Sequence, residues 1–324
     1  MAHGRRKDRA ETEATRMLDI FTIVAPVFLV VGAGYVAVWQ GLFSDQAVDG
    51  LMVFSQKFAI PCLLFAAMAQ LDLSTAFDPK VLFAYFASAI GCFCIGIAVA
   101  HHLFARPWPD SVAIGFAAMF ANTVLLGLPV MERAYGVDAL EANFTIVALN
   151  AATCYLIGIS TMEFIQAKTR GRALVFTVAN AMFHNSIMIG IALGLLVNVS
   201  GIAIPLIFAD ALDLMIRAAL PAALFGMGGV LFRYKPEGDL RTILFLCGLS
   251  LMVQPAMAFG LAHLGVLETA KLRSVVVTAA MAPGINAYLF ADMYGVARRV
   301  IATSVLIGTA LTVITASFWL LVLP

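Results

Sequence analysis

Charged residues are scarce in this chain. Only 12% of its 324 residues are Asp, Glu, Lys or Arg, whereas 62% are hydrophobic, and the mean hydropathy is +0.96. Average soluble domains carry about a quarter charged residues, roughly twice the share found here. Such a chain could not cover a water-facing surface, which excludes a soluble globular protein. The composition therefore indicates an integral membrane protein surrounded by lipid.

Motifs of metal sites and of enzymes are also missing from the sequence. The five cysteines form no CxxC pair, no His/Cys cluster has zinc spacing, and no HExxH or paired intramembrane aspartates appear. The net charge of +1 favours neither nucleic acid nor a strongly charged partner. We therefore expect no cofactor, no metal, no nucleic-acid partner and no enzymatic activity, and we interpret the cysteines as small buried hydrophobes.

The chain begins with a short charged segment, residues 1–16, that is poor in apolar residues. The apolar stretch behind it is too long for the core of a signal peptide and lacks an A-x-A cleavage site. We expect a disordered tail. Met17 is an equally good start of translation.

Apolar runs bounded by charges, proline and glycine predict ten membrane-spanning helices, since a bilayer requires roughly 20 apolar residues per span. The expected spans are 17–38, 46–70, 80–104, 110–134, 141–166, 173–197, 205–232, 241–264, 271–294 and 298–322. Five spans contain interior prolines, namely Pro61, Pro129, Pro221, Pro255 and Pro283. These prolines would break a soluble helix, but a membrane helix tolerates them where protein or water satisfies the freed backbone groups.

The two halves of the chain resemble each other at an offset of about 160 residues. The equivalent pairs are Gly34 and Gly194, Gly41 and Gly201, Lys57 and Arg217, Pro61 and Pro221, and Tyr135-Gly136 and Tyr294-Gly295. Each half, 17–166 and 173–324, holds five expected spans, so the second half enters the membrane from the opposite side. The sequence thus predicts an all-α membrane fold, a 5+5 inverted repeat joined by the linker 167–172, as is typical of secondary transporters.

Spans 4 and 9 carry similar interruptions at corresponding positions. The segments ANTVLLGLPV (121–130) and AMAPGINAY (280–288) each place Asn, Gly and Pro within eight residues of one another in an apolar helix. Proline and glycine let the backbone unwind, and asparagine brings an amide that can bond freed carbonyls or a ligand. We expect both helices to break and cross near the bilayer midplane, where the positive ends of half-helices favour an anionic group. The expected substrate-binding residues there are Asn122, Thr123, Gly127, Pro129, Pro283, Gly284 and Asn286.

These segments resemble the two crossover segments of the auxin efflux carrier family, which includes bacterial permeases labelled malonate or dicarboxylate transporters. The stretch 189–205 resembles the family's sixth span and the following loop, and the resemblance covers about 17–322. It implies a scaffold of spans 1, 2, 6 and 7, a mobile transport domain of the other six spans, and a homodimer. The implied function is secondary active transport, as a permease or efflux carrier, of a small organic anion such as a carboxylate by an elevator-type mechanism, with the substrate held at the crossover.

The chain departs from the family pattern in two places. Many relatives have Asn-Pro early in span 6, where this chain has Asn185-Ser186. The long central loop of the plant carriers is absent, because residues 167–172 alone join the halves. Auxin itself is therefore a poor candidate for the substrate.

Ionisable side chains inside spans are costly, so each is a functional candidate by default. Lys57 has no acid within a turn on either side, so its ammonium must snorkel, pair across helices or meet an anionic substrate. Arg217 follows Asp213 by four residues, so a structural ion pair accounts for it, with a part in coupling as the alternative. His184 could take part in proton coupling, although hydrogen-bonded packing is the simpler interpretation.

Other polar positions have structural explanations. Asn143 and Asn150 share one face of span 5, and we expect them to hydrogen-bond to neighbouring helices. Gly190 and Gly194 form a small-xxx-small pair that allows close helix contact. Three acids near span ends are expected to be hydrated: Glu132, Glu163 and Asp292.

Alternatives to a carboxylate permease remain open. A cation-coupled symporter of the bile-acid:sodium type has similar crossed helices and could bind its ion through carbonyls and amides; sodium-dependent uptake would distinguish it. A cation/proton antiporter is disfavoured because spans 4 and 9 have no carboxylate near Asn122 or Asn286. A channel is disfavoured because a pore does not call for broken helices in inverted halves.

The distribution of Lys and Arg predicts a multi-pass protein of the cell membrane, with both termini outside and 167–172 in the cytoplasm. In this orientation the inner loops carry nine basic residues and the outer loops four. If the five basic residues of the N-terminal tail are included, both sides carry nine. A cysteine placed at Thr169 should therefore not react with a membrane-impermeant maleimide added to intact cells. Efficient labelling there would reverse the orientation and leave the repeat untouched.

Overall fold

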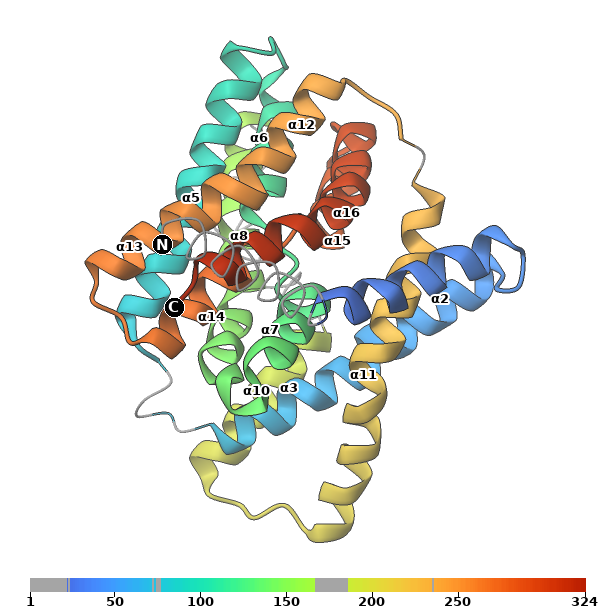
Figure 1. Cartoon of the computed structure of the whole chain (residues 1–324), viewed down its shortest axis with the longest axis vertical. Helices are drawn as coiled ribbons and strands as arrows, with labels where there is room; N and C mark the ends of the chain where they lie inside the picture. Colours follow the sequence, from blue (N-terminus) through green and yellow to red (C-terminus); the bar gives the residue numbers. More distant parts are fainter. Residues whose placement is uncertain (1–21, 23, 72, 74–76, 167–185, 235) are drawn as a thin grey trace, which may run out of the picture.

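The computed structural model describes residues 22, 24–71, 73, 77–166, 186–234 and 236–324. These residues are mostly helical, and the extended pairing among them is an isolated bridge between Ala121 and Pro283 (Figure 1). The all-α class predicted from the sequence is therefore confirmed. The expected tail, the linker 167–172 and His184 lie outside the described residues.

Six of the described helices are long and apolar enough to cross a bilayer. They are Asp45–Gln70 (α2, η1 and α3 in one run), α5 (Pro79–His102), α8 (Glu141–Gln166), α11 (Leu206–Arg233), Leu240–Leu264 (α12, η4 and α13 in one run) and α16 (Arg298–Val322). Shorter apolar helices over Val24–Trp39 and Ser186–Ser200 (α10) stand at the places of spans 1 and 6. The count of ten spans and the inverted relation of the halves stay predictions.

The helices at the places of spans 4 and 9 are both interrupted. The first consists of α6 (Trp108–Met119), followed by η2 (Thr123–Gly127) and α7 (Leu128–Tyr135), and a short 3-10 turn, η3 (Val137–Leu140), leads on to α8. The second consists of α14 (Thr269–Ala279) and α15 (Ile285–Tyr294). The two predicted breaks are thus observed, at residues 120–122 and 280–284.

Three interior prolines follow a π-helical turn instead of a break. The turns η1 (Ser55–Ala59), η2 and η4 (Leu249–Val253) each end two residues before a proline, namely Pro61, Pro129 and Pro255. A proline has no N–H and its ring clashes with the preceding turn, and a widened turn relieves both problems. Pro129 therefore lies in a continuous helix. The prediction that it interrupts span 4 is wrong, because the break ends seven residues earlier, at Asn122.

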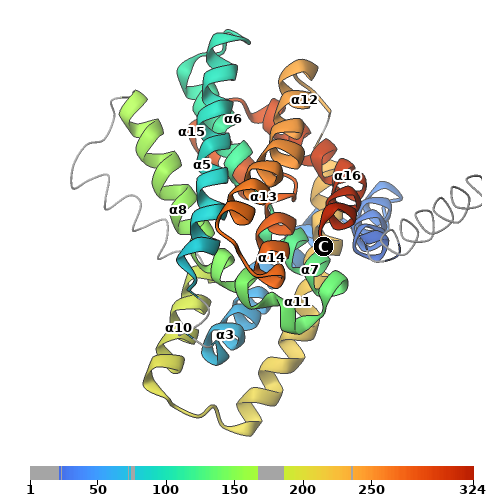
Figure 2. The same cartoon turned by 60° about the vertical axis from the view of Figure 1, so that its left-hand side comes forward.

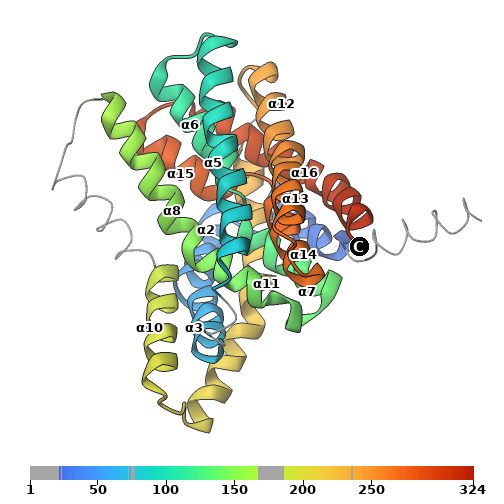
Figure 3. The same cartoon turned by 90° about the vertical axis from the view of Figure 1, so that its left-hand side faces the viewer.

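The helices pack into two groups. The scaffold group consists of Val24–Trp39, α2–α3, α10 and α11, and the body group of α5, α6, η2–α7, α8 and α12–α16. Figures 1, 2 and 3 show α3 and α10 side by side at the lower end of the molecule, with α5, α6 and α12 at the upper end. A cavity lined by residues of both groups lies between them.

Glycines that correspond in the repeat make corresponding contacts. A Cβ atom on Gly34 would overlap the carbonyl of Phe225 in α11, and one on Gly194 in α10 would overlap the carbonyl of Phe65 in α3. Both the glycines and the phenylalanines are 160 residues apart. A Cβ on Gly190 would likewise meet the backbone of α3, so the close helix contact expected for Gly190 and Gly194 is confirmed. These equivalent contacts support the predicted repeat.

Replacing Gly34 by alanine should destabilise the protein, because the added methyl group must displace the backbone of α11. Overpacking of this kind costs typically about 1–3 kcal/mol. Gly32 in the same helix is the matched control, since nothing lies within 4 Å of a Cβ placed there. Thermal unfolding in detergent should show a lower midpoint for Gly34→Ala and an unchanged or higher midpoint for Gly32→Ala. Equal midpoints would contradict the close contact.

Candidate functional site

The two breaks meet and bond to each other. The N–H of Asn122 donates to the carbonyl of Ala282 at 2.8 Å. The N–H of Gly284 donates to the carbonyl of Phe120 at 2.9 Å. Backbone groups that lose helical partners at one break are thus satisfied by the other break, which is the condition for irregular backbone at membrane depth. These hydrogen bonds define the crossover.

Asn122 determines where the second part of span 4 begins. Its Oδ1 accepts a hydrogen bond from the N–H of Leu125 at 3.2 Å, and its carbonyl accepts one from Gly127 at 3.0 Å. Asparagine is a preferred N-cap because its side chain satisfies one of the unpaired N–H groups of a helix start. The Nδ2 of this buried side chain donates to Sδ of Met227 in α11 at 3.4 Å, which links the body group to the scaffold group.

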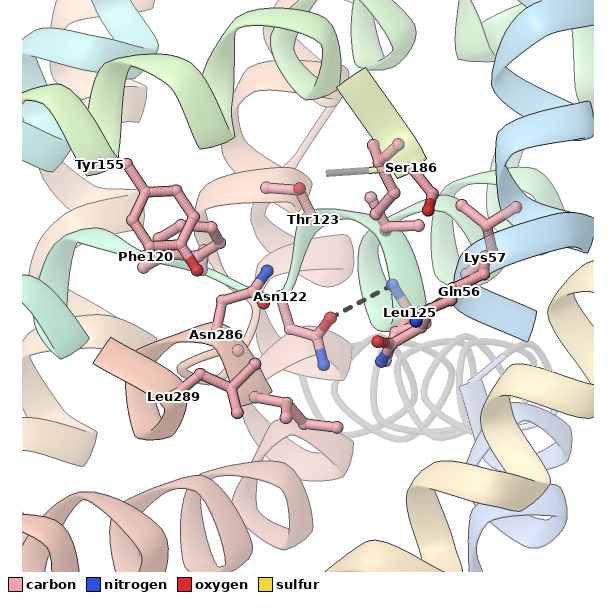
Figure 4. A pocket seen from close by; sticks show the side chains of 16 residues that line it. Gln56, Lys57, Phe120, Asn122, Thr123, Leu125, Tyr155, Ser186, Asn286 and Leu289 are labelled. Atoms are coloured by element: carbon pink, nitrogen blue, oxygen red, sulfur yellow. Dashed lines mark hydrogen bonds between the residues drawn. The ribbon is translucent and has the colours of Figure 1, made fainter. Parts of the chain in front are cut away.

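A cavity of about 320 Å³ adjoins the crossover between the two groups of helices. The body group lines it with residues of both breaks, the helix starts that follow them and α8: Phe120 to Leu125, Gly284 to Asn286, Leu289 and Tyr155. The scaffold group lines it with Gln56, Lys57, Ile60, Ser186 and Ile187. Figure 4 shows Tyr155, Phe120 and Asn286 on one side of the cavity, Lys57 and Ser186 on the other, and Asn122 and Thr123 between them.

Several polar side chains of this cavity are free to bind a ligand. The amides of Gln56 and Asn286, the hydroxyls of Thr123 and Tyr155 and the ammonium of Lys57 make no hydrogen bond or ion pair with any residue that the structure describes. Two helices also begin here. At the start of η2 most N–H groups already have partners, whereas the N–H groups of Ile285 and Asn286 at the start of α15 have none among the described residues. The described lining contains no Asp or Glu. The cavity therefore offers one positive charge together with amides and hydroxyls that can donate or accept hydrogen bonds.

The structure brings most of the predicted substrate-binding residues together. Those that line the crossover cavity are Asn122, Thr123, Gly284, Asn286 and Lys57. Gly127 does not line it, because it faces Met281 and Thr278. Pro283 does not line it either, because it packs against Gly308 of α16.

Two further predicted residues lie elsewhere. Pro129 and Arg217 line a second cavity, further along the helix η2–α7 from the crossover. Arg217 forms the expected ion pair with Asp213 of the same helix at 2.7 Å, which confirms that prediction. The other candidate for coupling, His184, lies outside the described residues.

Sequence reasoning missed several lining residues. Gln56 and Ser186 are single polar residues that belong to no motif, and Gln56 precedes Lys57 in the widened turn η1. Tyr155 lies near the middle of an uninterrupted span, where an aromatic residue is usually part of the packing. The one sequence signal for Gln56 is that it directly precedes Lys57, which was itself a predicted substrate-binding residue.

The intramembrane asparagines of span 5 bond to neighbouring helices, as predicted. Nδ2 of Asn143 donates to Oγ1 of Thr278 in α14 at 2.6 Å. Oδ1 of Asn150 accepts from the hydroxyl of Tyr85 in α5 at 3.3 Å. Both contacts hold α8 within the body group.

Glu163 contradicts the expectation of a hydrated carboxylate. It is only 8% exposed and accepts a hydrogen bond from the hydroxyl of Tyr294 at 3.0 Å. The prediction was wrong because Tyr294 at the end of α15 packs beside the end of α8, a tertiary contact that no local pattern shows. Asp292, by contrast, is half exposed and pairs with Arg298 at 3.1 Å.

The family model described as "Membrane transport protein" matches residues 19–320. The chain belongs to this family. The predicted resemblance to the auxin efflux carriers is thereby confirmed. A protein of Rhizobium meliloti (strain 1021) named "Putative malonate transporter" is 20% identical over 303 residues, which cover 93% of this chain and 95% of that protein. As a member of the membrane transport protein family with several apolar helices of spanning length, this chain is a multi-pass membrane transporter.

Proposed function

We propose that the protein is a secondary active transporter of a small organic anion with a carboxylate group, and that it binds this anion in the crossover cavity. The observation that supports this most is the combination of Lys57, free amides and the start of α15 in a cavity without described acidic residues. Carboxylates accept several hydrogen bonds, and charged donors give the strongest ones. The name of the relative makes a short dicarboxylate such as malonate a first substrate to test.

The size of the cavity supports a small substrate. Its volume of about 320 Å³ is near the lower end of the range for small-molecule sites, about 300–1,000 Å³. The lining is mixed, with Ile60, Phe120 and Leu289 beside the polar groups. A short carboxylate with a small apolar part would match both features.

The division into two groups supports an elevator-type mechanism, in which the body slides along the scaffold. In each of three ion pairs, both partners belong to the same group of helices. Within the body group, Lys271 pairs with Asp78 at 2.9 Å and Arg106 with Asp239 at 3.4 Å. Within the scaffold group, Arg233 pairs with Asp45 at 3.0 Å. Such pairs hold each group together without tying one group to the other. Small sliding of packed helices is an established type of domain motion.

The remaining architectural proposals accompany this mechanism. The equivalent glycine contacts and the paired breaks support ten spans in a 5+5 inverted repeat. A homodimer is proposed from the family resemblance alone, and termini outside the cell from the distribution of basic residues.

A sodium-coupled symporter is the second candidate. It is favoured by Oδ1 of Asn143 and Oε1 of Gln254, which are buried in the body group and have no hydrogen-bond partner among the described residues. Amide oxygens of this kind could coordinate a hard cation such as sodium. Uptake that requires a sodium gradient would favour this candidate over a proton-coupled or uncoupled carrier.

The role of Lys57 can be tested by uptake of labelled mono- and dicarboxylates into proteoliposomes, with and without pH and sodium gradients. Lys57→Met should reduce uptake of the preferred anion at least about tenfold, because a hydrogen bond to a charged group is worth about 1.5–3 kcal/mol. Lys57→Arg should retain part of the activity, since the charge remains while its geometry changes. Lys80→Met, which removes an exposed lysine outside the cavity, is the control. Normal uptake by Lys57→Met would show that the lysine is only an interfacial anchor.

The crossover asparagines should serve one ligand. Asn122→Ala and Asn286→Ala should each weaken carboxylate binding by roughly 5- to 150-fold, because the ligand would be left with an unmatched polar group costing about 1–3 kcal/mol. The double variant should lose less than the sum if both amides contact one anion. Binding is measured by calorimetry in detergent.

Unfolding without ligand provides the control for these two variants. Asn122→Ala should also lose about 1 kcal/mol of stability with its N-cap, whereas Asn286, whose amide has no described partner, should not. Unchanged affinity in both single variants would contradict the proposal that the anion binds at the crossover and that the transport path passes through it.

A further inference from the structure

A second cavity, of about 470 Å³, lies between the same two groups of helices. From the body it is lined by Pro129, Glu132 and Arg133 of α7 and by Phe144 near the start of α8. Phe144 and Tyr155, which line the second and the crossover cavity, are eleven residues apart on α8. At 1.5 Å per residue the two cavities are therefore separated by roughly 16 Å along that helix.

The scaffold presents equivalent walls to the two cavities. Each described scaffold residue that lines the crossover cavity has its counterpart, at an offset of 160 residues, in the lining of the second. In pairs, these are Gln56 and Ile216, Lys57 and Arg217, Ile60 and Leu220, Ser186 and Pro26, and Ile187 and Val27. A complete match of this kind indicates that the second cavity is related to the first by the symmetry of the repeat.

We call the scaffold lining of the crossover cavity the Lys57 wall and that of the second cavity the Arg217 wall. The body group presents a different surface to each wall. The Lys57 wall faces the crossover and the first residues of η2, Thr123 to Leu125. The Arg217 wall faces Pro129, Glu132 and Arg133, about eight residues further along the same continuous helix. Eight residues of helix span roughly 12 Å. The body would have to move by about this distance to bring the crossover from the Lys57 wall to the Arg217 wall.

We propose that the second cavity is the substrate chamber of the opposite transport state, in which Arg217 binds the carboxylate that Lys57 binds here. This rests on the proposed function, because it requires the body to slide and carry the crossover from one wall to the other. Arg217 keeps donors for this task. Its Nε and Nη2 both bond Oδ2 of Asp213, at 3.0 and 2.7 Å, and a guanidinium has five N–H groups.

The charges around Arg217 predict a weaker site than that of Lys57. Asp213 offsets the charge of Arg217, and Glu132 and Arg133, which face the same cavity, offset each other. Lys57 has no acidic partner among the described residues. The anion would therefore be held less tightly at the Arg217 wall, which favours its release on that side of the membrane.

The movement itself can be tested by cross-linking, without any substrate. In a variant without the five native cysteines, Thr123→Cys is combined with Gln56→Cys or with its counterpart Ile216→Cys, and membranes are treated with a short bifunctional thiol reagent. Both pairs should cross-link, the first in the present state and the second in the opposite state. Thr123→Cys with Ile207→Cys, an exposed position of α11 outside both cavities, should not. Cross-linking to position 56 but never to position 216 would overturn the proposal.

The role of Arg217 can be tested by sided uptake of labelled malonate into right-side-out and inside-out vesicles. Arg217→Gln should raise KM about tenfold on one face and Lys57→Gln on the other, with partial rescue by Arg217→Lys. Arg299→Gln is the control, since Arg299 is as exposed as Arg217 (79% and 76%) and also ion-paired, but lies outside both cavities.

Two results would separate the possible failures. If Asp213→Asn reproduces the full loss of Arg217→Gln, the arginine acts only through its ion pair and the second chamber has no anion site. If the unmodified protein takes up no malonate, the proposed substrate is wrong, while the cross-linking still decides whether the crossover reaches the Arg217 wall.

Discussion

Irregular backbone inside a bilayer must find its hydrogen-bond partners within the protein, and the crossover of this transporter meets that requirement with two bonds. Each break supplies one donor and one acceptor to the other, between Asn122 and Ala282 and between Gly284 and Phe120. Neither helix could be broken alone without leaving these groups unpaired in an apolar surrounding, at a cost of several kcal/mol each. The two breaks are therefore mutually dependent, and so are the helix starts that follow them. The crossover wall of the cavity, with the free amide of Asn286, depends on this pair of bonds, whereas Gln56 and Lys57 come from the scaffold group.

The fold was largely predictable because hydrophobic length is a strong signal. Span 298–322 agrees with α16 to the residue and span 80–104 agrees with α5 to within two residues, since charged residues, proline and glycine stand at their ends. The site was predictable only in part. Asn122 and Asn286 stand out because an amide in an apolar helix is rare, whereas Tyr155 and Ser186 reach the same cavity from other helices and carry no local sign of it.

The errors share one physical cause, which is that a local rule was applied where a contact decided the outcome. Proline breaks a helix in principle, but a π turn accommodates Pro129, and the N-cap of Asn122 places the break earlier. An acid near a span end is hydrated in principle, but Tyr294 covers Glu163. Both outcomes depend on residues far away in the sequence or on backbone geometry that composition does not encode.

The contact between Asn122 and Met227 has a consequence for speed. It is a hydrogen bond from an amide to a thioether, a weak acceptor on a flexible and unbranched side chain. In the proposed elevator mechanism this contact would have to break in every cycle, and each 1.36 kcal/mol of additional activation free energy slows a step tenfold. A side chain with a carboxylate or carbonyl acceptor at position 227 would make a stronger hydrogen bond to Asn122 and would slow a movement that breaks it. With methionine at this position, the contact would add little to the activation free energy of the proposed sliding step.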